Sequence, residues 1–184
     1  MDVFEAIHNR QSIGKMRQDP VPRELIEKIL EAAVQAPNHY STRPWRWVVM
    51  MGEARKQLGD VMAASIKGDA ASKPEALEAE RAKPLRAPVV IAVGVDKPME
   101  SKVKDIENIC AAAAAAQNLL LAATALGLAS IWRTGGAVDD PNIKIFLGFA
   151  PDQHLLGFIY VGYPANPTNE RNRPSFEDRT LWME

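Results

Sequence analysis

Residues 109–132 read ICAAAAAAQNLLLAATALGLASIW, a long and strongly apolar stretch in a chain of 184 residues. Its length suits a membrane span, but Gln117 and Asn118 interrupt it, and alanine contributes little hydrophobic drive. Its flanks carry no aromatic belt or basic cluster. We therefore expect a buried helix from about Val103 to Leu126, with Gly127 as its stop, and no membrane association.

The sequence on either side of this helix predicts strands that are separated mostly by helices. A short apolar run with β-branched residues indicates a strand, and apolar residues three and four apart indicate a helix. Four strands alternating with helices predict a single layered domain with helices on both faces of a sheet. The predicted strands are Trp45–Met51, Pro88–Val95, Ala129–Arg133 and Leu155–Gly162, and the predicted helices include Asp2–Asn9, Leu25–Val34, Glu53–Ile66 and Pro141–Leu147.

Composition and charge exclude several classes of protein. A chain that is 47% hydrophobic with a net charge of −1 is typical of a globular protein and has no basic footprint for nucleic acid. Cys110 is the only cysteine, so no internal disulfide forms and a reducing setting is expected. The first residues, MDVFEAIHNR, lack the pattern of a signal peptide, which favours a cytoplasmic location.

Familiar catalytic and metal-binding motifs are absent from the sequence. It contains neither a Gly-x-Gly-x-x-Gly fingerprint nor a P-loop, and no Gly-x-Ser-x-Gly elbow. His8, His39 and His154 are far apart and no Cys-x-x-Cys occurs, so no metal site is expected.

Arg10-Gln11-Ser12 follows the first predicted helix directly. A phosphate needs a delocalised cation that can bind two oxygens, together with neutral donors. Arg10 and Ser12 supply both on an extended segment, with backbone amides between them. The alternative is a solvated arginine and a serine that caps a turn, because Arg-x-Ser is common by chance.

Two further segments combine polar side chains with breaks in regular structure. Residues 36–45, APNHYSTRPW, connect the end of a helix to an apolar strand and include His39, with Gln35 one helical turn earlier. Residues 130–136, SIWRTGG, place Trp132, Arg133 and Thr134 at a strand end before two glycines, where a backbone can approach a ligand closely. The alternative for each is a solvated helix or strand terminus.

The order and spacing of these three segments, from Asp2 to about Pro164, resemble the FMN-dependent nitroreductase family. The resemblance implies an α+β fold with a mixed sheet flanked by helices, in a homodimer with two flavins at the interface. Arg10 and Ser12 would then hold the ribityl-phosphate end of FMN, and Gln11 would approach the isoalloxazine. Gln35 and His39 would reach the other subunit's flavin, while Trp132, Arg133 and Thr134 would contact the flavin ring or phosphate.

The sequence departs from the family pattern at two positions. Gln11 stands where the family often has a second arginine, and Arg43 replaces the glutamine of a Gln-Pro-Trp motif. The small alanine side chains of residues 111–125 would allow close helix packing across a dimer. They equally suit the central helix of a monomer, and periodicity alone does not separate the two.

The resemblance implies transfer of a hydride from NAD(P)H through FMN to a nitroaromatic, quinone or related small-molecule acceptor. No protein side chain need act as a catalytic acid or base, because the cofactor carries the chemistry. Two alternatives stay open: a non-catalytic flavin-binding or sensing member of the same fold, and an unrelated soluble α/β enzyme.

Overall fold

The computed structural model describes residues 1–68, 73–167 and 172–184, and its centre is one sheet. The strand order is β1-β2-β4-β3. In chain order the strands are β1 (Trp45–Met51), β2 (Val89–Val95), β3 (Ala129–Arg133) and β4 (His154–Gly162). Each predicted strand is present, and β1 and β3 have the predicted bounds.

All three strand pairs of the sheet are antiparallel, so the mixed sheet that the resemblance implied is not present among the described strands. A parallel bridge joins Ser12 to Ser130 at the β3 edge, and an antiparallel bridge joins Met16 to Pro164. The N-terminal segment therefore runs beside the sheet. It places residues 10–14 next to β3, which the sequence pattern did not reveal.

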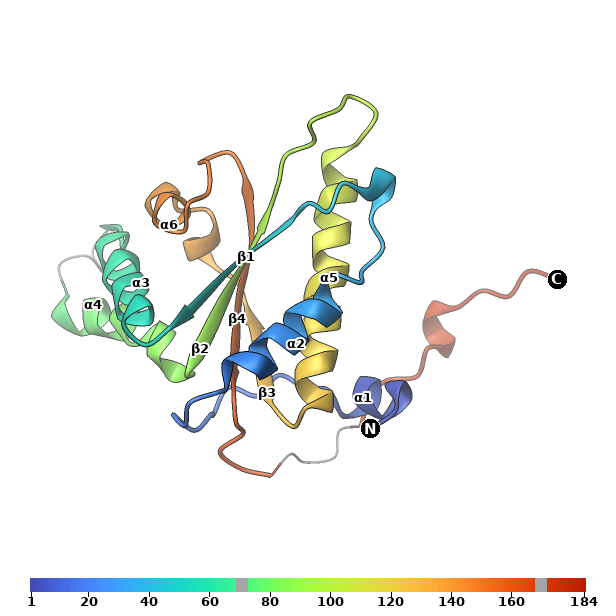
Figure 1. The fold of residues 1–184 in the computed structure, drawn as a ribbon, viewed down its shortest axis with the longest axis horizontal. Helices are drawn as coiled ribbons and strands as arrows, with labels where there is room; N and C mark the ends of the chain where they lie inside the picture. Colours follow the sequence, from blue (N-terminus) through green and yellow to red (C-terminus); the bar gives the residue numbers. More distant parts are fainter. Residues whose placement is uncertain (69–72, 168–171) are drawn as a thin grey trace.

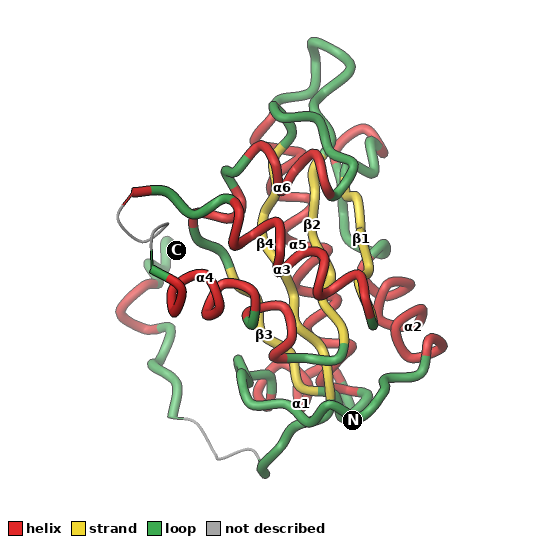
Figure 2. The backbone as a smooth tube through the Cα atoms, turned by 90° about the vertical axis from the view of Figure 1, so that its left-hand side faces the viewer, coloured by secondary structure: helices red, strands yellow, loops and turns green. Residues whose placement is uncertain are grey.

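Helices cover both faces of the sheet, as predicted for an α+β layered fold (Figures 1 and 2). On one side lie α1 (Val3–Asn9), α2 (Arg23–Ala33) and α5 (Asp105–Ala125). On the other lie α3 (Glu53–Ala64), α4 (Pro74–Arg81) and α6 (Pro141–Phe146).

Strand β2 forms the middle of the core because its side chains alternate between two apolar clusters. Val89, Ile91 and Val93 pack with the α2 and α5 cluster. Val90 and Ala92 pack with the cluster that includes α3 and α6. A strand covered on both faces needs a continuous apolar run, which explains the sequence PVVIAVGV.

Helix α5 ends as predicted, and it is buried along one face only. Gly127 adopts a φ of +74°, and the Leu128 amide donates to the Ala123 carbonyl over 2.8 Å, which closes the helix end. Leu119 is fully buried, whereas the opposite face leaves Ile106 exposed in the single chain. By length and composition α5 also passes the test for a membrane span, as core helices of soluble proteins do.

Three segments differ from the expectations or extend beyond them. Helix α2 ends at Ala33, so Val34 lies in the C-cap and is exposed instead of joining the apolar face. Between α3 and β2 the chain forms the further helix α4, and residues 69–72 before it lie outside the described ranges. The C-terminal residues project away from the body of the chain (Figure 1).

Candidate functional site

Arg10 lies at the C-cap of α1, where the chain changes from helix to extended backbone. A capping box between Asp2 and Glu5 fixes the start of α1. Because α1 is a short helix, this also fixes the position of Arg10 at its other end. Beyond it, the Ile13 amide donates to the Ser130 carbonyl over 3.0 Å. Segment 10–13 is thereby held against the edge of β3.

Arg133 lies at the end of β3 and points to the face covered by α3 and α6. Its guanidinium carbon lies 5.8 Å from the centre of the Tyr160 ring. A Cβ placed on Gly14 would be 3.2 Å from Arg133 Nη2, so the guanidinium reaches the N-terminal segment. The first and third predicted segments therefore meet at the β3 edge.

Trp132 points to the opposite face, as strand alternation requires. Its indole N–H donates to the Leu156 carbonyl over 2.9 Å, and the ring packs on Gly157 of β4. The indole N–H is therefore occupied within the protein. The predicted contact between Trp132 and a cofactor stays a prediction.

A cavity of about 720 Å³ opens beside Arg133, between the sheet and the α3 and α6 layer. The loop after β3 forms one wall with Thr134, Gly135 and Gly136. Gly135 has a φ of +116°, which L-residues rarely adopt, and a Cβ there would meet no atom within 4 Å. The volume lies within the range of about 300–1,000 Å³ that is common for small-molecule sites.

The charges around the cavity leave an excess of cations. Glu80 is paired with Lys83, and the Asp140 carboxylate caps α6 and accepts from Ser65 Oγ over 3.0 Å. Lys67, Arg86 and Arg133 also line the cavity, as does Asp139, and none of these four has an ion pair among the described residues, so the cations of the lining exceed the carboxylates by one. An anionic or electron-rich ligand suits this lining better than a cation does.

Arg133 Nε is buried in this wall without a hydrogen-bond partner among the described residues. A buried polar group of this kind costs free energy unless a ligand or water satisfies it. Tyr160 lies next to it and is also buried. Burial raises the pKa of the Tyr160 phenol, while the charges of Arg133 and Arg86 oppose that change.

Sequence reasoning missed Lys83, Arg86 and Tyr160 as cavity residues. Residues 83–86, KPLR, form a short turn before β2, but no local pattern shows which face of the sheet that turn serves. Arg171 and Arg173 in the C-terminal tail belong to none of the three predicted segments, but Arg173 lies beside one of them. Its guanidinium donates to the Arg10 carbonyl over 2.5 Å, so it adds a cation beside the first segment. The other, Arg171, lies outside the described residues.

Gln35 and His39 lie away from this cavity. Gln35 Nε2 donates to the Glu31 carbonyl over 3.3 Å, beyond the end of α2. His39 Nε2 is 4.0 Å from Glu107 Oε1, near the start of α5. Figure 1 places this turn and α1 at opposite ends of α5, a helix of 21 residues and therefore about 30 Å long. Within one chain, the second predicted segment does not join the other two.

The turn after His39 is conformationally strained. Tyr40, Ser41 and Arg43 all have positive φ, at 52°, 54° and 47°. Each such residue costs roughly 1–2 kcal/mol relative to the right-handed conformation. The Arg43 amide donates to Asn38 Oδ1 over 2.8 Å, which supports the turn from within.

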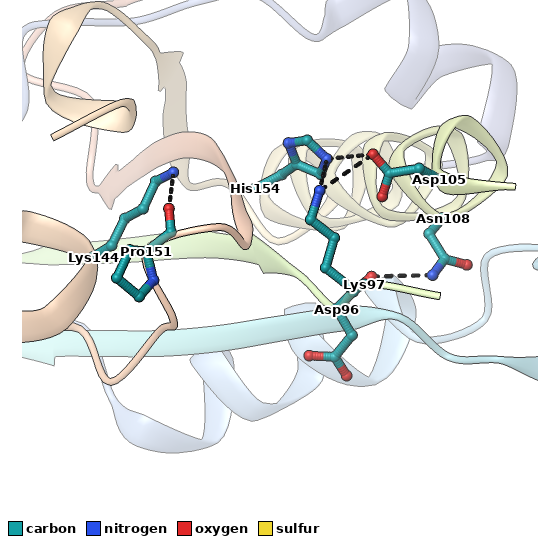
Figure 3. A network of polar contacts seen from close by, with 7 residues as sticks. All are labelled: Asp96, Lys97, Asp105, Asn108, Lys144, Pro151 and His154. Carbon is teal, nitrogen blue, oxygen red and sulfur yellow. Dashed lines mark hydrogen bonds and ion pairs between the residues drawn. The ribbon is translucent and has the colours of Figure 1, made fainter. Parts of the chain in front are cut away.

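A polar cluster of Lys97, Asp105 and His154 ties the start of α5 to the ends of β2 and β4 (Figure 3). Asp105 Oδ2 lies 2.5 Å from His154 Nε2 and 3.5 Å from Lys97 Nζ. Among the described residues, no group of three or more His, Cys, Asp or Glu side chains could hold a metal ion.

This cluster predicts a pH dependence of stability. The hydrogen bond with His154, and the nearby charges of His154 and Lys97, lower the pKa of Asp105. Because the folded-state pKa is the lower one, the contribution is complete above the unfolded value of about 4 and disappears as the pH falls through the folded value. We expect Asp105→Asn to lower the free energy of unfolding at pH 7 by about 1 kcal/mol or less, since the carboxylate is partly exposed.

The measurement is chemical denaturation of both proteins between pH 7 and pH 3. The two unfolding free energies should converge as the pH falls below about 4. A difference that stays constant over this range would contradict the role of the ionised carboxylate. Asp60→Asn is a suitable control, because Asp60 pairs with Arg81 on the surface.

Comparison with known proteins places this chain in a family. The family model described as "Nitroreductase family" matches residues 7–163. YdjA of Escherichia coli strain K12, named as a candidate NAD(P)H nitroreductase, is 31% identical over 164 residues, which cover 89% of each chain.

Two solved structures resemble this chain over nearly its full length. A nitroreductase-like family protein from Bacillus cereus has a TM-score of 0.88 at 25% identity, covering 100% of this chain and 97% of that one. A candidate nitroreductase from Desulfovibrio desulfuricans was solved in complex with FMN. It has a TM-score of 0.76 at 27% identity, and the match covers 100% of this chain and 98% of that one. With the family model spanning most of the domain, this chain belongs to the nitroreductase family.

Proposed function

We propose that the protein is a cytoplasmic, homodimeric FMN-dependent oxidoreductase that uses NAD(P)H to reduce a nitroaromatic, quinone or related acceptor. The observation that carries the proposal is the cavity lined by Arg133, Thr134 and the Gly135 loop. Family membership and an FMN-bound relative support the same cofactor.

The residues present fit a flavin nucleotide. Arg133, Thr134 and the Gly135 loop would hold its ring system, because they offer a cation, a hydroxyl and an open backbone. Arg10 and Ser12, with Arg173 beside them, would hold the phosphate. FMN supplies hydride transfer when bound, so the protein contributes binding, orientation and electrostatics.

The remaining site residues would set the hydrogen bonding and the charge around the flavin. Gln11 would give hydrogen bonds without charge, and the cations of the cavity, Lys83 and Arg86 among them, would favour electron-rich ligands. No side chain is required as a catalytic acid or base in this proposal. Gln35 and His39 would serve the site of a second copy, because neither lines the cavity of its own chain: Gln35 bonds back to Glu31 of α2, and His39 lies near Glu107 at the start of α5.

A homodimer also accounts for apolar surface that a single chain leaves open. Phe4 on α1 is 69% exposed, and Leu181, Trp182 and Met183 in the tail are 84%, 76% and 89% exposed. A large exposed apolar patch marks a contact with another chain, and we propose that the partner subunit covers these side chains. Sedimentation equilibrium should give about twice the 20.2 kDa mass of one chain, and a monomeric mass would contradict this part of the proposal.

The experiment that tests the function is an absorption spectrum of the purified protein, followed by release and identification of the flavin. Stoichiometric FMN, with turnover of NAD(P)H in the presence of a quinone, is the expected result. Colourless protein that does not take up added FMN would refute the proposal. Bound FMN without NAD(P)H turnover would favour the non-catalytic alternative, to which the uncharged Gln11 lends support.

The role of Arg10 predicts a measurable loss of cofactor. We expect Arg10→Ala to bind FMN about tenfold more weakly, because one charge-assisted contact to the phosphate is removed. The measurement is flavin content after purification, together with titration by flavin fluorescence. Arg23→Ala is the control, because Arg23 pairs with Glu27 on the surface. Full flavin content in Arg10→Ala would contradict the assignment.

A further inference from the structure

The strained turn after His39 is anchored to α5 by one buried amide. Asn108 is only 2% exposed, in a helix that is otherwise rich in alanine. Its Oδ1 accepts a hydrogen bond from Thr42 Oγ1 over 3.2 Å. Its Nδ2 donates to the Asp96 carbonyl over 3.0 Å, as Figure 3 shows.

The same few residues hold the far end of the turn. The Asp96 amide donates to the Pro44 carbonyl over 2.7 Å, so Asn108 is linked to the chain on both sides of Arg43. Positive φ values in non-glycine residues persist only where the surroundings determine the conformation. The hydrogen bonds of Asn108 and of Asn38 provide that determination here.

Neither of the two hydrogen bonds described for the Asn108 side chain goes to another residue of α5. Asparagine is a weaker helix former than alanine, and a buried amide costs free energy unless both of its ends are bonded. Asn108 satisfies that condition by bonding outward, to Thr42 and Asp96. The feature therefore serves the turn.

The turn presents its rings to the surface. The His39 and Tyr40 rings lie 4.2 Å apart in an edge-to-face arrangement, and both side chains are exposed. His39 also borders a shallow hollow of about 560 Å³ with Glu107 and Cys110. A strained backbone that keeps two rings exposed is typical of a binding surface.

We propose that Asn108 is a positioning residue: through Thr42 it holds the turn 39–43 in the conformation that lets His39 contact FMN bound to the second copy. This inference rests on the proposed function, because it needs a flavin in a dimer. It adds a residue that neither the sequence motifs nor the lining of the large cavity indicated.

The test uses Thr42, because Asn108 is buried and its replacement could disturb folding. Thr42→Val keeps the shape of an exposed side chain but removes the hydroxyl donor, whereas Thr42→Ser keeps the hydroxyl. The first readout is hydrogen exchange of the amides of residues 38–43 in flavin-free protein. The second is the dissociation constant of FMN, measured by fluorescence.

We expect Thr42→Val to speed exchange in the turn by about fivefold and to weaken FMN binding by a similar factor, the effect of one hydrogen bond. Thr42→Ser should match the wild type in both readouts and in melting temperature, whereas Thr42→Val should melt only about 2–4 °C lower, which leaves it folded at the temperature of both measurements.

Each other outcome overturns the inference in a recognisable way. Faster exchange with unchanged FMN affinity would make Asn108 purely structural. Unchanged exchange in Thr42→Val would remove the anchoring role, whatever the affinity. Wild-type protein that binds no FMN would refute the proposed function, and the inference with it. Wild type that binds FMN, beside a Thr42→Val variant that is identical to it, would refute the role of Asn108 alone.

Discussion

Arg133→Gln is expected to weaken FMN binding by about 30-fold, because a hydrogen bond to a charged group contributes roughly 2 kcal/mol. The arginine lies in the wall of the large cavity, and its Nε is buried without a partner among the described residues. FMN is proposed to contact the part of the guanidinium that lines the cavity. The measurement is titration of flavin-free protein with FMN.

A second readout separates this binding role from a structural one. Removing a buried, unsatisfied donor relieves a desolvation cost, so flavin-free Arg133→Gln should melt at or above the temperature of the wild type. The rise in melting temperature on adding FMN should become smaller, because weaker binding stabilises less at the same ligand concentration. A variant that melts much lower without flavin would show that Arg133 mainly supports the fold. Arg23→Gln serves as the surface control.

Gly157→Ala should destabilise the fold by about 3 kcal/mol, since it adds both a steric clash and backbone strain. Gly157 has a φ of +140°, and a Cβ there would lie 2.4 Å from the Arg133 carbonyl oxygen and 2.5 Å from Trp132 Nε1. Neither the strand backbone nor the packed indole can move away easily. For a protein of this size the expected fall in melting temperature is about 6–12 °C.

Gly127→Ala provides the matched control for this prediction. Gly127 also has a positive φ, at +74°, but a Cβ there would meet no atom within 4 Å. Its replacement therefore adds strain without a clash and should cost about 1–2 kcal/mol. Equal effects of the two substitutions in thermal and chemical denaturation would show that the contact between Gly157 and β3 is unimportant. Because Arg133 follows Trp132 directly, Gly157→Ala should also reduce FMN binding.

Local patterns in the sequence were sufficient to predict the elements of the fold. Short apolar segments predicted β1 and β3 with the bounds that the structure has, and Gly127 correctly predicted the end of α5. These features depend on neighbouring residues in the chain: side-chain shape, apolar spacing and the conformational freedom of glycine. The end of α2 was predicted less well, because the last turn tightens before Pro37 and leaves Val34 outside the helix.

The sequence predicted only some of the residues that form the candidate site. Arg133 and Thr134 were predicted and do line the large cavity, and Ser12 was predicted and lies against β3. Arg86 and Tyr160 were missed, because a charged turn and a tyrosine in a strand carry no local sign of a shared cavity. Their roles toward FMN, like those of Gln35, His39 and Trp132, stay predictions for the experiments above.

The sequence by itself determined the strands, the helices and the three polar segments, because short-range patterns along the chain encode them. The tertiary structure decided which segments meet. Antiparallel pairing in the order β1-β2-β4-β3 puts β3 at an edge, where it pairs with Ser12 and opens a cavity at Arg133. It also leaves His39 near the start of α5, outside the lining of that cavity. Such contacts join residues more than 100 positions apart, and they depend on the packing of whole layers, which no local pattern records.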